Sequence, residues 1–495
     1  MPTRRQIAAG LAALTLGAAR APGIGAAPSG LPPRPARATP ATRREPLTLV
    51  AAERDSPVLG PGRPTSRVWT YAPGGQAAAP ALPILRAEVG EILDVTLENR
   101  LPEHTSIHWH GLRLPAAMDG VPYLTQPPVL PGQRFAYSFP LLDTGTYFLH
   151  PHCNETGQSG RGLAAVLVVT GDEPPGTEPD ADLVVAVKDW RLAPDGSFLP
   201  FETREGAGRA GTFGTIRGVN GTAGPLVATV PAGGDVRLRL LNLDGTRIVQ
   251  LGIEGGDAAV IATDGHGIEP FPLDTWRLGP AMRLDVLARA PRPGETLRVI
   301  DYGSAEPWTV AILTAAGPDK GRGPFAPVGL YASSVPEADA DGAERRSFTF
   351  SAAAGSAPEA EILNGLPPDD PLARVLLDSL CVRDTSLWAI NKVAWPSAAN
   401  PVLPPPLGEL VAGRPYVFEL VNVTPHPHPI HLHGHAFRVL SSNRQTLPRF
   451  TADTVILNPR ERVEIAFVAA PGDWMLHCHI LEHLDFGMMG YLRVA

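Results

Sequence analysis

Residues 82–101 read LPILRAEVGEILDVTLENRL, and residues 135–150 read FAYSFPLLDTGTYFLH. Apolar residues in these runs alternate with polar ones or follow one another without a break, and Pro, Gly and Asn bound them. Alternation is typical of a strand with one buried face, and an unbroken short apolar run is typical of a strand buried on both faces. Both runs therefore predict strands of a β-sandwich.

Runs of the same kind recur along the 495 residues and fall into three blocks. The second block contains DLVVAVKDW and DVRLRLLNL, and the third contains PYVFELVNV and RVEIAFVAA. Each block is long enough for one sandwich, and a chain of this length exceeds what one core supports. We therefore predict an all-β fold with domains at residues 46–171, 178–318 and 343–495, and a Gly- and Pro-rich linker over residues 316–341.

The segment before the first block, residues 1–45, is predicted to be an export signal followed from residue 28 by a Pro-, Ala- and Arg-rich linker. Arg4 and Arg5 precede an apolar run over residues 7–19. This pattern resembles a twin-arginine signal, which carries folded proteins; an ordinary secretory signal holding two arginines is the alternative. We expect a periplasmic or secreted protein.

Composition excludes several classes of protein. The net charge is −8, and removal of residues 1–27 changes it to −11 because three arginines and no acidic residues are lost, so nucleic-acid binding is not expected. No later stretch reaches 18 uninterrupted apolar residues, so no membrane span is predicted. The three cysteines, Cys153, Cys381 and Cys478, are too few and too far apart for a disulfide framework or a Cys-rich zinc module.

The histidines are clustered far beyond chance. Random placement of 14 His in 495 residues gives about 0.4 HxH pairs, whereas the chain has six. Residues i and i+2 of a strand share a face and stand about 6.5–7 Å apart, which suits two neighbouring ions better than one. An isolated pair usually has no function, but this number predicts a polynuclear metal site. The pairs are His108/His110, His150/His152, His426/His428, His431/His433, His433/His435 and His477/His479.

The remaining ligands indicate copper. Cys478 lies in HCHILEHLDFGMM, with His483 five residues and Met488 ten residues further on. With His428 they form a His₂Cys set with a weak thioether, which is typical of a blue-copper centre. Zinc would favour more Cys or carboxylate ligands, and a two-His, one-carboxylate iron site lacks an evident carboxylate.

The position of Cys478 between two histidines predicts a route for electrons. In an extended strand, the Cys478 side chain points to one face while those of His477 and His479 point to the other. A mononuclear copper would then be covalently linked to a polynuclear cluster on the order of 10 Å away.

Four motifs, IHWHGL, YFLHPH, HPIHLHGH and HCHILEHLDFGMM, resemble in kind and order those of the multicopper oxidases, the family of laccases, ascorbate oxidase and bacterial cuprous oxidases. The resemblance covers essentially the whole chain after the signal. It implies three cupredoxin-like Greek-key β-sandwich domains, the second without copper, and four copper ions held in the third domain and between the first and third. It assigns His428, Cys478, His483 and axial Met488 to type 1 copper, His108 and His431 to type 2, and His110, His150, His152, His433, His477 and His479 to the type 3 pair.

The resemblance also implies the reaction. The family couples four one-electron oxidations of a donor to the reduction of dioxygen to water, and Cys478, His477 and His479 would carry the electrons. The donor is expected to approach the type 1 site near His428 or His483. Asp119 in MDGVP matches an acidic residue that the family places near the cluster for proton delivery; an Asp before Gly also suits a turn, and spacing alone does not separate the two.

Some residues depart from the family pattern. Several bacterial relatives have Glu directly after the last type 1 histidine, where this chain has Leu484, so the proton path is expected to differ. Cys153 and Cys381 are expected to be buried free thiols, with an interdomain disulfide as the alternative. The four histidines outside the pattern are expected to be structural or to support the ligands: His104, His266, His426 and His435.

The donor is the least determined feature. We favour a laccase-like oxidase of phenolic or aromatic donors; the alternative is a metal-ion oxidase acting on Cu⁺, Fe²⁺ or Mn²⁺, although the six methionines form no Met-rich insert. A non-catalytic cupredoxin-like scaffold of the cell envelope would have lost copper ligands, and all of them are present here. A copper nitrite reductase would not place its type 1 cysteine between two cluster histidines. The sequence makes no prediction of the oligomeric state.

Overall fold

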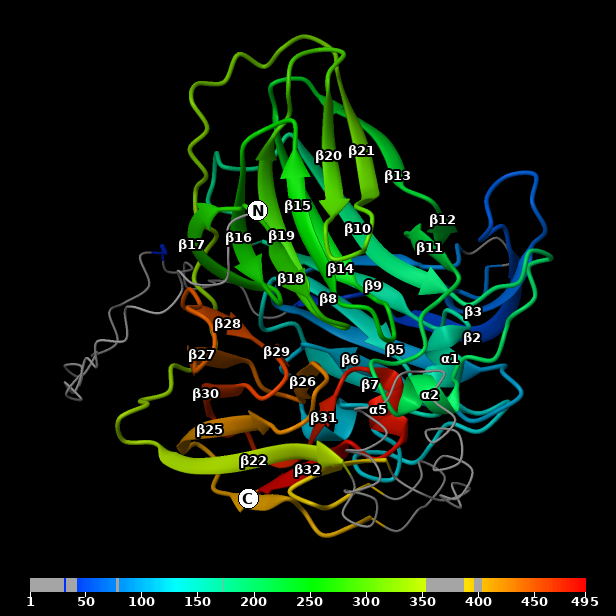
Figure 1. The fold of residues 1–495 in the computed structure, drawn as a ribbon, viewed down its shortest axis with the longest axis vertical. Coiled ribbons are helices and arrows are strands. Elements are labelled where there is room, and N and C mark those ends of the chain that lie inside the picture. Colours follow the sequence, from blue (N-terminus) through cyan, green and yellow to red (C-terminus); the bar gives the residue numbers. More distant parts are fainter. Residues whose placement is uncertain (1–30, 33–41, 77–79, 172, 353–386, 396–402) are drawn as a thin grey trace, which may run out of the picture.

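The computed structural model describes residues 31–32, 42–76, 80–171, 173–352, 387–395 and 403–495. These residues form six β-sheets, which pair into three sandwich domains (Figure 1). The predicted all-β fold of three cupredoxin-like sandwiches is therefore confirmed.

The first domain contains a five-stranded and a four-stranded sheet. The larger sheet consists of β3 (Ser66–Pro73), β2 (Leu47–Ser56), β5 (Glu91–Asn99), β1 (Thr42–Arg43) and β7 (Arg134–Pro140), and the smaller of β4 (Ile84–Glu88), β9 (Ala165–Thr170), β8 (Gly145–His150) and β6 (His108–His110). The short strand β1 pairs with β5, although its residues fall in the segment predicted to be a linker.

The second domain contains a seven-stranded and a five-stranded sheet. The larger consists of β12 (Thr222–Ala223), β11 (Ile216–Val219), β10 (Ala181–Trp190), β14 (Asp235–Asn242), β19 (Arg283–Arg289), β16 (Ala258–Thr263) and β17 (His266–Pro272). The smaller consists of β13 (Leu226–Pro231), β21 (Trp308–Ala316), β20 (Thr296–Asp301), β15 (Val249–Glu254) and β18 (Trp276–Leu278).

The third domain contains a six-stranded and a five-stranded sheet. The larger consists of β23 (Trp388–Ile390), β22 (Glu344–Ala352), β25 (Pro415–Asn422), β30 (Arg462–Val468), β27 (Phe437–Ser442) and β28 (Phe450–Ala452). The smaller consists of β24 (Gly408–Leu410), β32 (Met489–Val494), β31 (Gly472–Cys478), β26 (His428–Leu432) and β29 (Thr454–Leu457).

All three domains share one pairing pattern. In the larger sheets, β2 pairs in parallel with β5, β10 with β14, and β22 with β25. In the smaller sheets, β4 pairs in parallel with β9, β13 with β21, and β24 with β32. The same topology therefore occurs three times along the chain.

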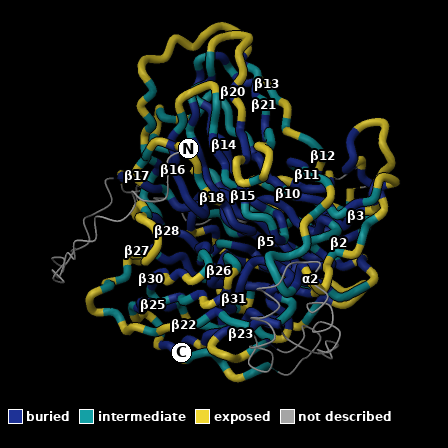
Figure 2. The backbone as a smooth tube through the Cα atoms, in the orientation of Figure 1, coloured by how far each residue is buried: buried dark blue, intermediate teal, exposed yellow. Residues whose placement is uncertain are grey.

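Burial explains why some strand sequences alternate and others do not. Along β5 the side chains of Leu93, Val95 and Leu97 are buried, and the residues between them are more exposed. Strand β8 is buried along its whole length, because the sheet that contains it packs on its own sandwich and on the second domain. Its Phe148 lies in one apolar cluster with Val184 of β10, and Figure 2 shows the buried strands at the centre of the molecule.

Helices are few and short in the described part of the chain. They are η1 (Ala116–Met118), α1 (Glu155–Gly160), α2 (Arg204–Ala207) and α5 (Leu481–Asp485). Residues 317–343 connect the last two domains without a strand or helix. In the described residues, no helix combines the length and apolar character that crossing a membrane requires.

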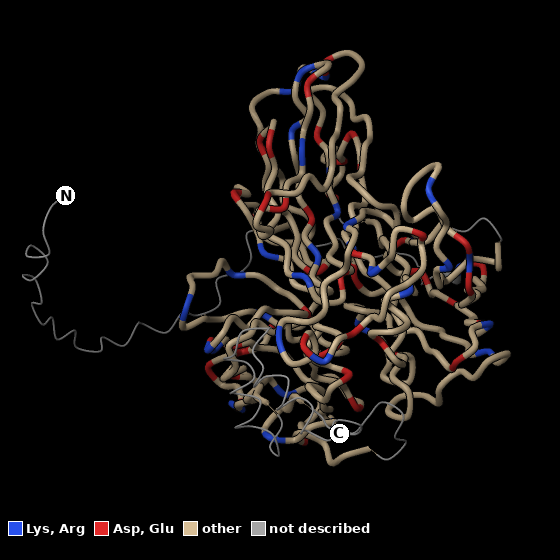
Figure 3. The backbone as a smooth tube through the Cα atoms, turned by 45° about the vertical axis from the view of Figure 1, so that its right-hand side comes forward, with Lys and Arg blue, Asp and Glu red and all other residues tan. Residues whose placement is uncertain are grey.

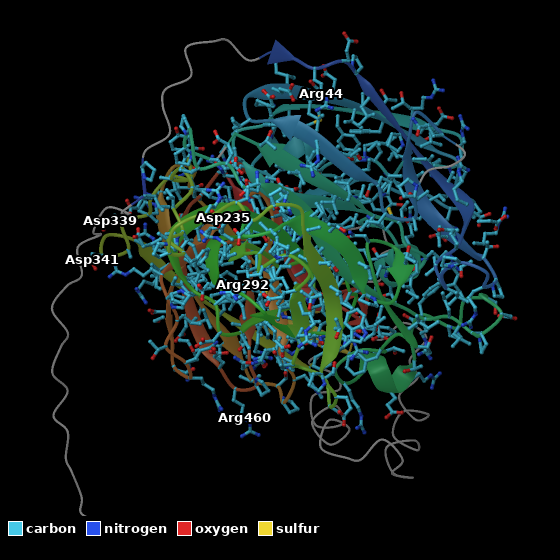
Figure 4. The ribbon with its side chains drawn as sticks, turned by 90° about the horizontal axis from the view of Figure 1, so that it is seen from above. Arg44, Asp235, Arg292, Asp339, Asp341 and Arg460 are labelled. Atoms are coloured by element: carbon cyan, nitrogen blue, oxygen red, sulfur yellow. The ribbon has the colours of Figure 1, made fainter. Side chains whose placement is uncertain are left out.

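Charged side chains lie mostly at the periphery. Figure 3 shows acidic and basic residues interspersed along the chain, and the labelled Arg292 and Arg460 in Figure 4 are exposed. The larger sheet of the second domain is different, because Arg237, Arg239 and Arg283 are at most 1% exposed. Each of them is paired with a buried aspartate, as burial of a charge requires.

Candidate metal centres

Neighbouring strands bring the histidine motifs side by side. In the first domain β6 pairs with β8, with His108 opposite His150. In the third domain β26 pairs with β31, with His431 opposite His477 and Ile430 opposite Cys478. Because side chains alternate across a strand, Cys478 and the histidines on either side of it face different directions. The HxH motifs therefore meet at the interface of the first and third domains.

Eight buried histidines form one centre between these two domains, which we call the eight-histidine centre. Imidazole rings from the two domains interleave, with centroids 3.8 Å apart for His110 and His431 and 3.9 Å apart for His108 and His433. Three sets of nitrogens lie within 4.8 Å of one another: His108, His110 and His431; His110, His150 and His479; and His152, His433 and His477. Two of the four HxH pairs, His150/His152 and His477/His479, are divided between the last two sets, as a polynuclear site requires.

Hydrogen bonds fix which nitrogen of each ring carries the proton. A carbonyl oxygen can only accept, so His108 Nδ1 donates to Asp119 O and His431 Nδ1 donates to Asp453 O, both at 2.8 Å. His150 Nδ1 donates to Pro151 O at 3.0 Å. The Nε2 lone pairs of these three rings are then buried without a protein partner. Such unsatisfied groups are costly unless a cation occupies the centre.

The set formed by His152, His433 and His477 gives the same indication more directly. His433 Nδ1 donates to Asp119 Oδ2 at 2.8 Å and His477 Nδ1 donates to Cys478 O at 2.9 Å, and His152 Nδ1 lies 2.7 Å from Glu155 Oε1. The unprotonated Nε2 atoms of His433 and His477 therefore lie 2.9 Å apart, and His152 Nε2 lies 3.2 Å from His433 Nε2. Lone pairs at such distances repel one another unless a positive ion lies between them.

The second centre, which we call the cysteine centre, consists of His428, Cys478 and His483. His483 Nε2 donates to Arg209 O at 2.6 Å, and His428 Nε2 to Thr424 Oγ1 at 2.7 Å. Both Nδ1 atoms are consequently unprotonated; they lie 3.0 Å apart and 3.5 and 3.6 Å from Cys478 Sγ.

Met488 is held beside this centre. Its side chain is fully buried in the same apolar cluster as Cys478, and its carbonyl accepts a hydrogen bond from the Cys478 amide at 3.0 Å. Two imidazoles and a thiol, next to a methionine residue that pairs with the cysteine through its backbone, suit copper, whereas zinc would favour a tetrahedral site. The donor set therefore fits the predicted metal.

Burial keeps His152, His428, His477 and His483 neutral, which is the state that binds a metal. It lowers the pKa of His152 and of His483 to about 3, and it lowers the pKa of His428 and His477 well below the ordinary value. Burial also raises the pKa of the Cys478 thiol well above its ordinary range. A thiolate at this position therefore needs a cation to replace its proton.

The structure brings the predicted metal-binding histidines and Cys478 together. Every predicted histidine ligand and Cys478 lies in one of the two centres. Asp119 is 1% exposed, and its carboxylate stands behind the rings of His433 (2.8 Å) and His108 (3.4 Å). Leu484 is buried in an apolar cluster with Met475 and Tyr491.

The residues outside the pattern have other roles. His435 Nδ1 donates to His433 O and its Nε2 accepts from the Ala470 amide, both at 2.8 Å, so it supports the backbone of a ligand strand. Cys153 is a buried free thiol, and Cys381 lies outside the described residues, as does the signal over residues 1–27.

Sequence reasoning missed two carboxylates beside the ligand histidines. Glu155 at the start of α1 lies 2.7 Å from Nδ1 of His152, three residues earlier, and burial raises the pKa of Glu155 to about 8. Asp453, just before β29, accepts from His110 Nε2 at 3.1 Å through Oδ1. The spacing of Glu155 from His152 was a usable signal, but nothing in the local sequence marks Asp453.

The two histidines near which the donor is expected to approach are shielded from solvent. His428 and His483 are both 0% exposed, because Trp388 of β23 packs against both rings and a segment of the second domain reaches His483. Trp388 lies over His483 with ring centroids 4.5 Å apart, and its indole N–H donates to Ala207 O at 2.7 Å. An electron must therefore cross a layer of protein to reach the cysteine centre.

Comparison with known proteins agrees with this geometry. Three family profiles, each described as multicopper oxidase, match residues 61–174, 182–304 and 371–495. The chain is 28% identical to the multicopper oxidase MmcO of Mycobacterium tuberculosis, over 82% of this chain and 80% of that protein. It is 27% identical to laccase-1 of Botryotinia fuckeliana, over 87% of this chain and 78% of that one.

A solved structure gives a closer match. A multicopper oxidase from Pseudomonas thermotolerans is 36% identical, with 92% of this chain and 100% of that chain covered and a TM-score of 0.78. Together with the buried histidine centres, these matches establish that the chain belongs to the multicopper oxidase family.

Proposed function

We propose that the protein is a laccase-like oxidase that takes single electrons from phenolic or other aromatic donors and reduces dioxygen to water. Type 1 copper would bind at His428, Cys478 and His483, with Met488 as a further ligand. Type 2 copper would bind at His108 and His431, and the remaining six histidines of the eight-histidine centre would hold the type 3 pair. The observation that carries the proposal is the convergence of unprotonated imidazole nitrogens in both buried centres.

When bound, copper supplies one-electron chemistry by cycling between its +1 and +2 states. The chain contributes the arrangement of the two centres. Strand β31 places Cys478 in one centre and His477 and His479 in the other, so two adjacent peptide units connect them. This covalent link provides the shortest path through bonds for the electrons that dioxygen reduction requires.

Asp119 is proposed to hold a proton close to the eight-histidine centre. Its Oδ2 accepts from His433 Nδ1 at 2.8 Å, and its Oδ1 lies 3.4 Å from His108 Nδ1. The carboxylate therefore lies at the Nδ1 side of both rings, away from their Nε2 atoms. At this position it can pass a proton without binding a metal. Leu484 offers no such group, which makes Asp119 the stronger candidate.

One observation favours an aromatic donor over a metal ion. Within the described residues, every group of His, Cys, Asp and Glu with metal-ligand spacing belongs to the two buried centres, so none offers a separate ion a binding site. The cleft beside α5, lined by Phe201, Thr212 and Leu481, has a volume of about 40 Å³, which is too small for an aromatic ring. The donor is therefore expected to give up its electron at the surface, as loosely selective aromatic oxidases do.

Copper analysis and oxygen uptake test this proposal. Purified, copper-loaded protein should contain about four copper ions and show the intense blue thiolate band. It should consume one dioxygen for every four molecules of a methoxyphenol oxidised by one electron, without releasing peroxide. If the oxidation rate with Cu⁺ or Fe²⁺ were far above the rate with every phenol, the donor would be a metal ion and not an aromatic compound. Protein that contained far fewer than four copper ions would refute the site assignment.

We also propose that the protein is exported, through the twin-arginine route. The support is Arg4 and Arg5 before the apolar run over residues 7–19. Changing both arginines to lysine should cause uncleaved precursor to accumulate in the cytoplasm, as fractionation and mass spectrometry would show. Normal export of this variant would point to an ordinary secretory signal.

A further inference from the structure

Arg283, at the start of β19 in the second domain, contacts all three domains at one point. Its guanidinium is fully buried, and each of its five N–H groups has an acceptor. Nε donates to Thr146 O of the first domain at 3.0 Å. Nη1 donates to Ala281 O (3.1 Å) and Asp453 Oδ1 (2.9 Å), and Nη2 to Asp264 O (3.0 Å) and Asp453 Oδ2 (2.6 Å).

Asp453 of the third domain connects this arginine to the eight-histidine centre. Its Oδ1 also accepts from His110 Nε2 at 3.1 Å, and its backbone carbonyl accepts from His431 Nδ1 at 2.8 Å. The Asp453 amide in turn donates to the carboxylate of Asp264 at 3.2 Å. One aspartate thus sets the proton position on one histidine from each of the two metal-binding domains.

This contact determines an unusual feature of His110. His110 presents an unprotonated Nδ1 to the centre, because its proton is on Nε2, which donates to Asp453. His108, His150 and His431 present Nε2. If Asp453 moved, His110 could change tautomer and withdraw its ligand atom.

The backbone next to His110 is shaped around the same guanidinium. Gly111 has a φ of +86°, and a Cβ at this position would lie 2.2 Å from Arg283 Nη2 and 2.6 Å from Asp453 Oδ2. A side chain here would clash with the ion pair as well as strain the backbone. The glycine after the HxH motif therefore allows the second domain to reach the metal centre.

We infer that Arg283 is a positioning residue for the eight-histidine centre, so that the domain without copper ligands helps to set the geometry of the metal site. The inference rests on the proposed function. A bidentate arginine binds both oxygens of a carboxylate through two parallel hydrogen bonds and so fixes the rotation of that carboxylate. This orients Asp453 toward His110. Partners of this kind behind ligand histidines typically change metal affinity or activity about 10- to 100-fold when they are lost.

Arg283→Lys tests the inference, because lysine keeps the charge but cannot reach five acceptors from one planar group. The expected result is a blue thiolate band and an anaerobic rate of type 1 reduction that are unchanged. The electron paramagnetic resonance signal of type 2 copper should change or weaken, and kcat should fall about 10- to 100-fold at an unchanged KM for the donor.

Arg239→Lys is the matched control. Arg239 is also 0% exposed, pairs with Asp285 and Asp182, and reaches Thr146 Oγ1 of the first domain at 3.1 Å. It contacts neither His110 nor Asp453, so its replacement should cost stability and leave the type 2 signal and kcat unchanged. Equal effects of both substitutions on the signal and kcat would reduce Arg283 to a general interdomain contact and overturn the inference.

Asp453→Asn decides the question if Arg283→Lys does not fold. This nearly isosteric change keeps an acceptor for His110 but weakens the pairing with Arg283, and it should alter the type 2 signal in the same direction. An unaltered signal and kcat in folded Asp453→Asn protein would also overturn the inference. A wild-type protein without copper or oxygen reduction would instead refute the proposed function, so the two failures are distinguishable.

Discussion

Replacing Cys478 with serine is expected to remove both the blue band and the oxidase activity while the protein stays folded. Serine is almost isosteric with cysteine, and its hydroxyl is a poor ligand for a soft copper ion. The Cys478 side chain is 0% exposed among apolar neighbours, so the change costs some stability but leaves the eight histidines in place. Absorption spectra, copper analysis and oxygen uptake should show activity at background and about three quarters of the copper retained.

Cys153→Ser is the matched control for this prediction. Cys153 is also a buried thiol that directly follows a histidine of the eight-histidine centre, but it belongs to neither set of metal-binding atoms. Its replacement should leave the blue band and the rate unchanged. If Cys478→Ser protein turned over at the wild-type rate, the link through His477 and His479 would not be the route of the electrons.

The arrangement of site residues that are close together in the sequence could be predicted. Contacts between residues that only the fold brings together could not. The HxH spacing predicted shared strand faces, and the position of Cys478 predicted two centres, because both follow from the alternation of side chains along a strand. The alternating and unbroken apolar runs likewise predicted sandwich strands. Local periodicity carries this information without any knowledge of the tertiary structure.

The supporting contacts depend on tertiary structure alone. Arg283 lies 170 residues from Asp453 and 137 from Thr146 in sequence, and no local pattern relates them. The burial of His483 was also unpredictable, since Arg209 and Trp388 reach it from distant segments. The identity of the ligands could therefore be predicted from the sequence, whereas their protonation and burial could be determined only from the structure.

Removing copper is expected to destabilise the protein strongly, because the eight-histidine centre draws ligands from both the first and the third domain. A ligand at 1,000 times its Kd stabilises the state that binds it by about 4 kcal/mol. The melting temperature of chelator-treated protein should therefore fall by about 10 °C or more. Calorimetry would measure the fall in melting temperature. The rate of proteolysis in the connection over residues 317–343 would measure how far the domains separate.

The stability of the copper-free protein should itself decrease as the pH falls. Burial lowers the pKa of His152 and His483 to about 3 in the folded protein, against about 6.5 in an unfolded chain. The unfolded state then binds more protons, so this contribution to stability is present above about pH 6.5 and is lost progressively toward pH 3. Copper should restore the melting temperature, and Mg²⁺, which prefers oxygen ligands, should not. A melting temperature that chelation left unchanged would mean that the interface is held by the protein alone, through contacts such as that of Arg283 with Asp453.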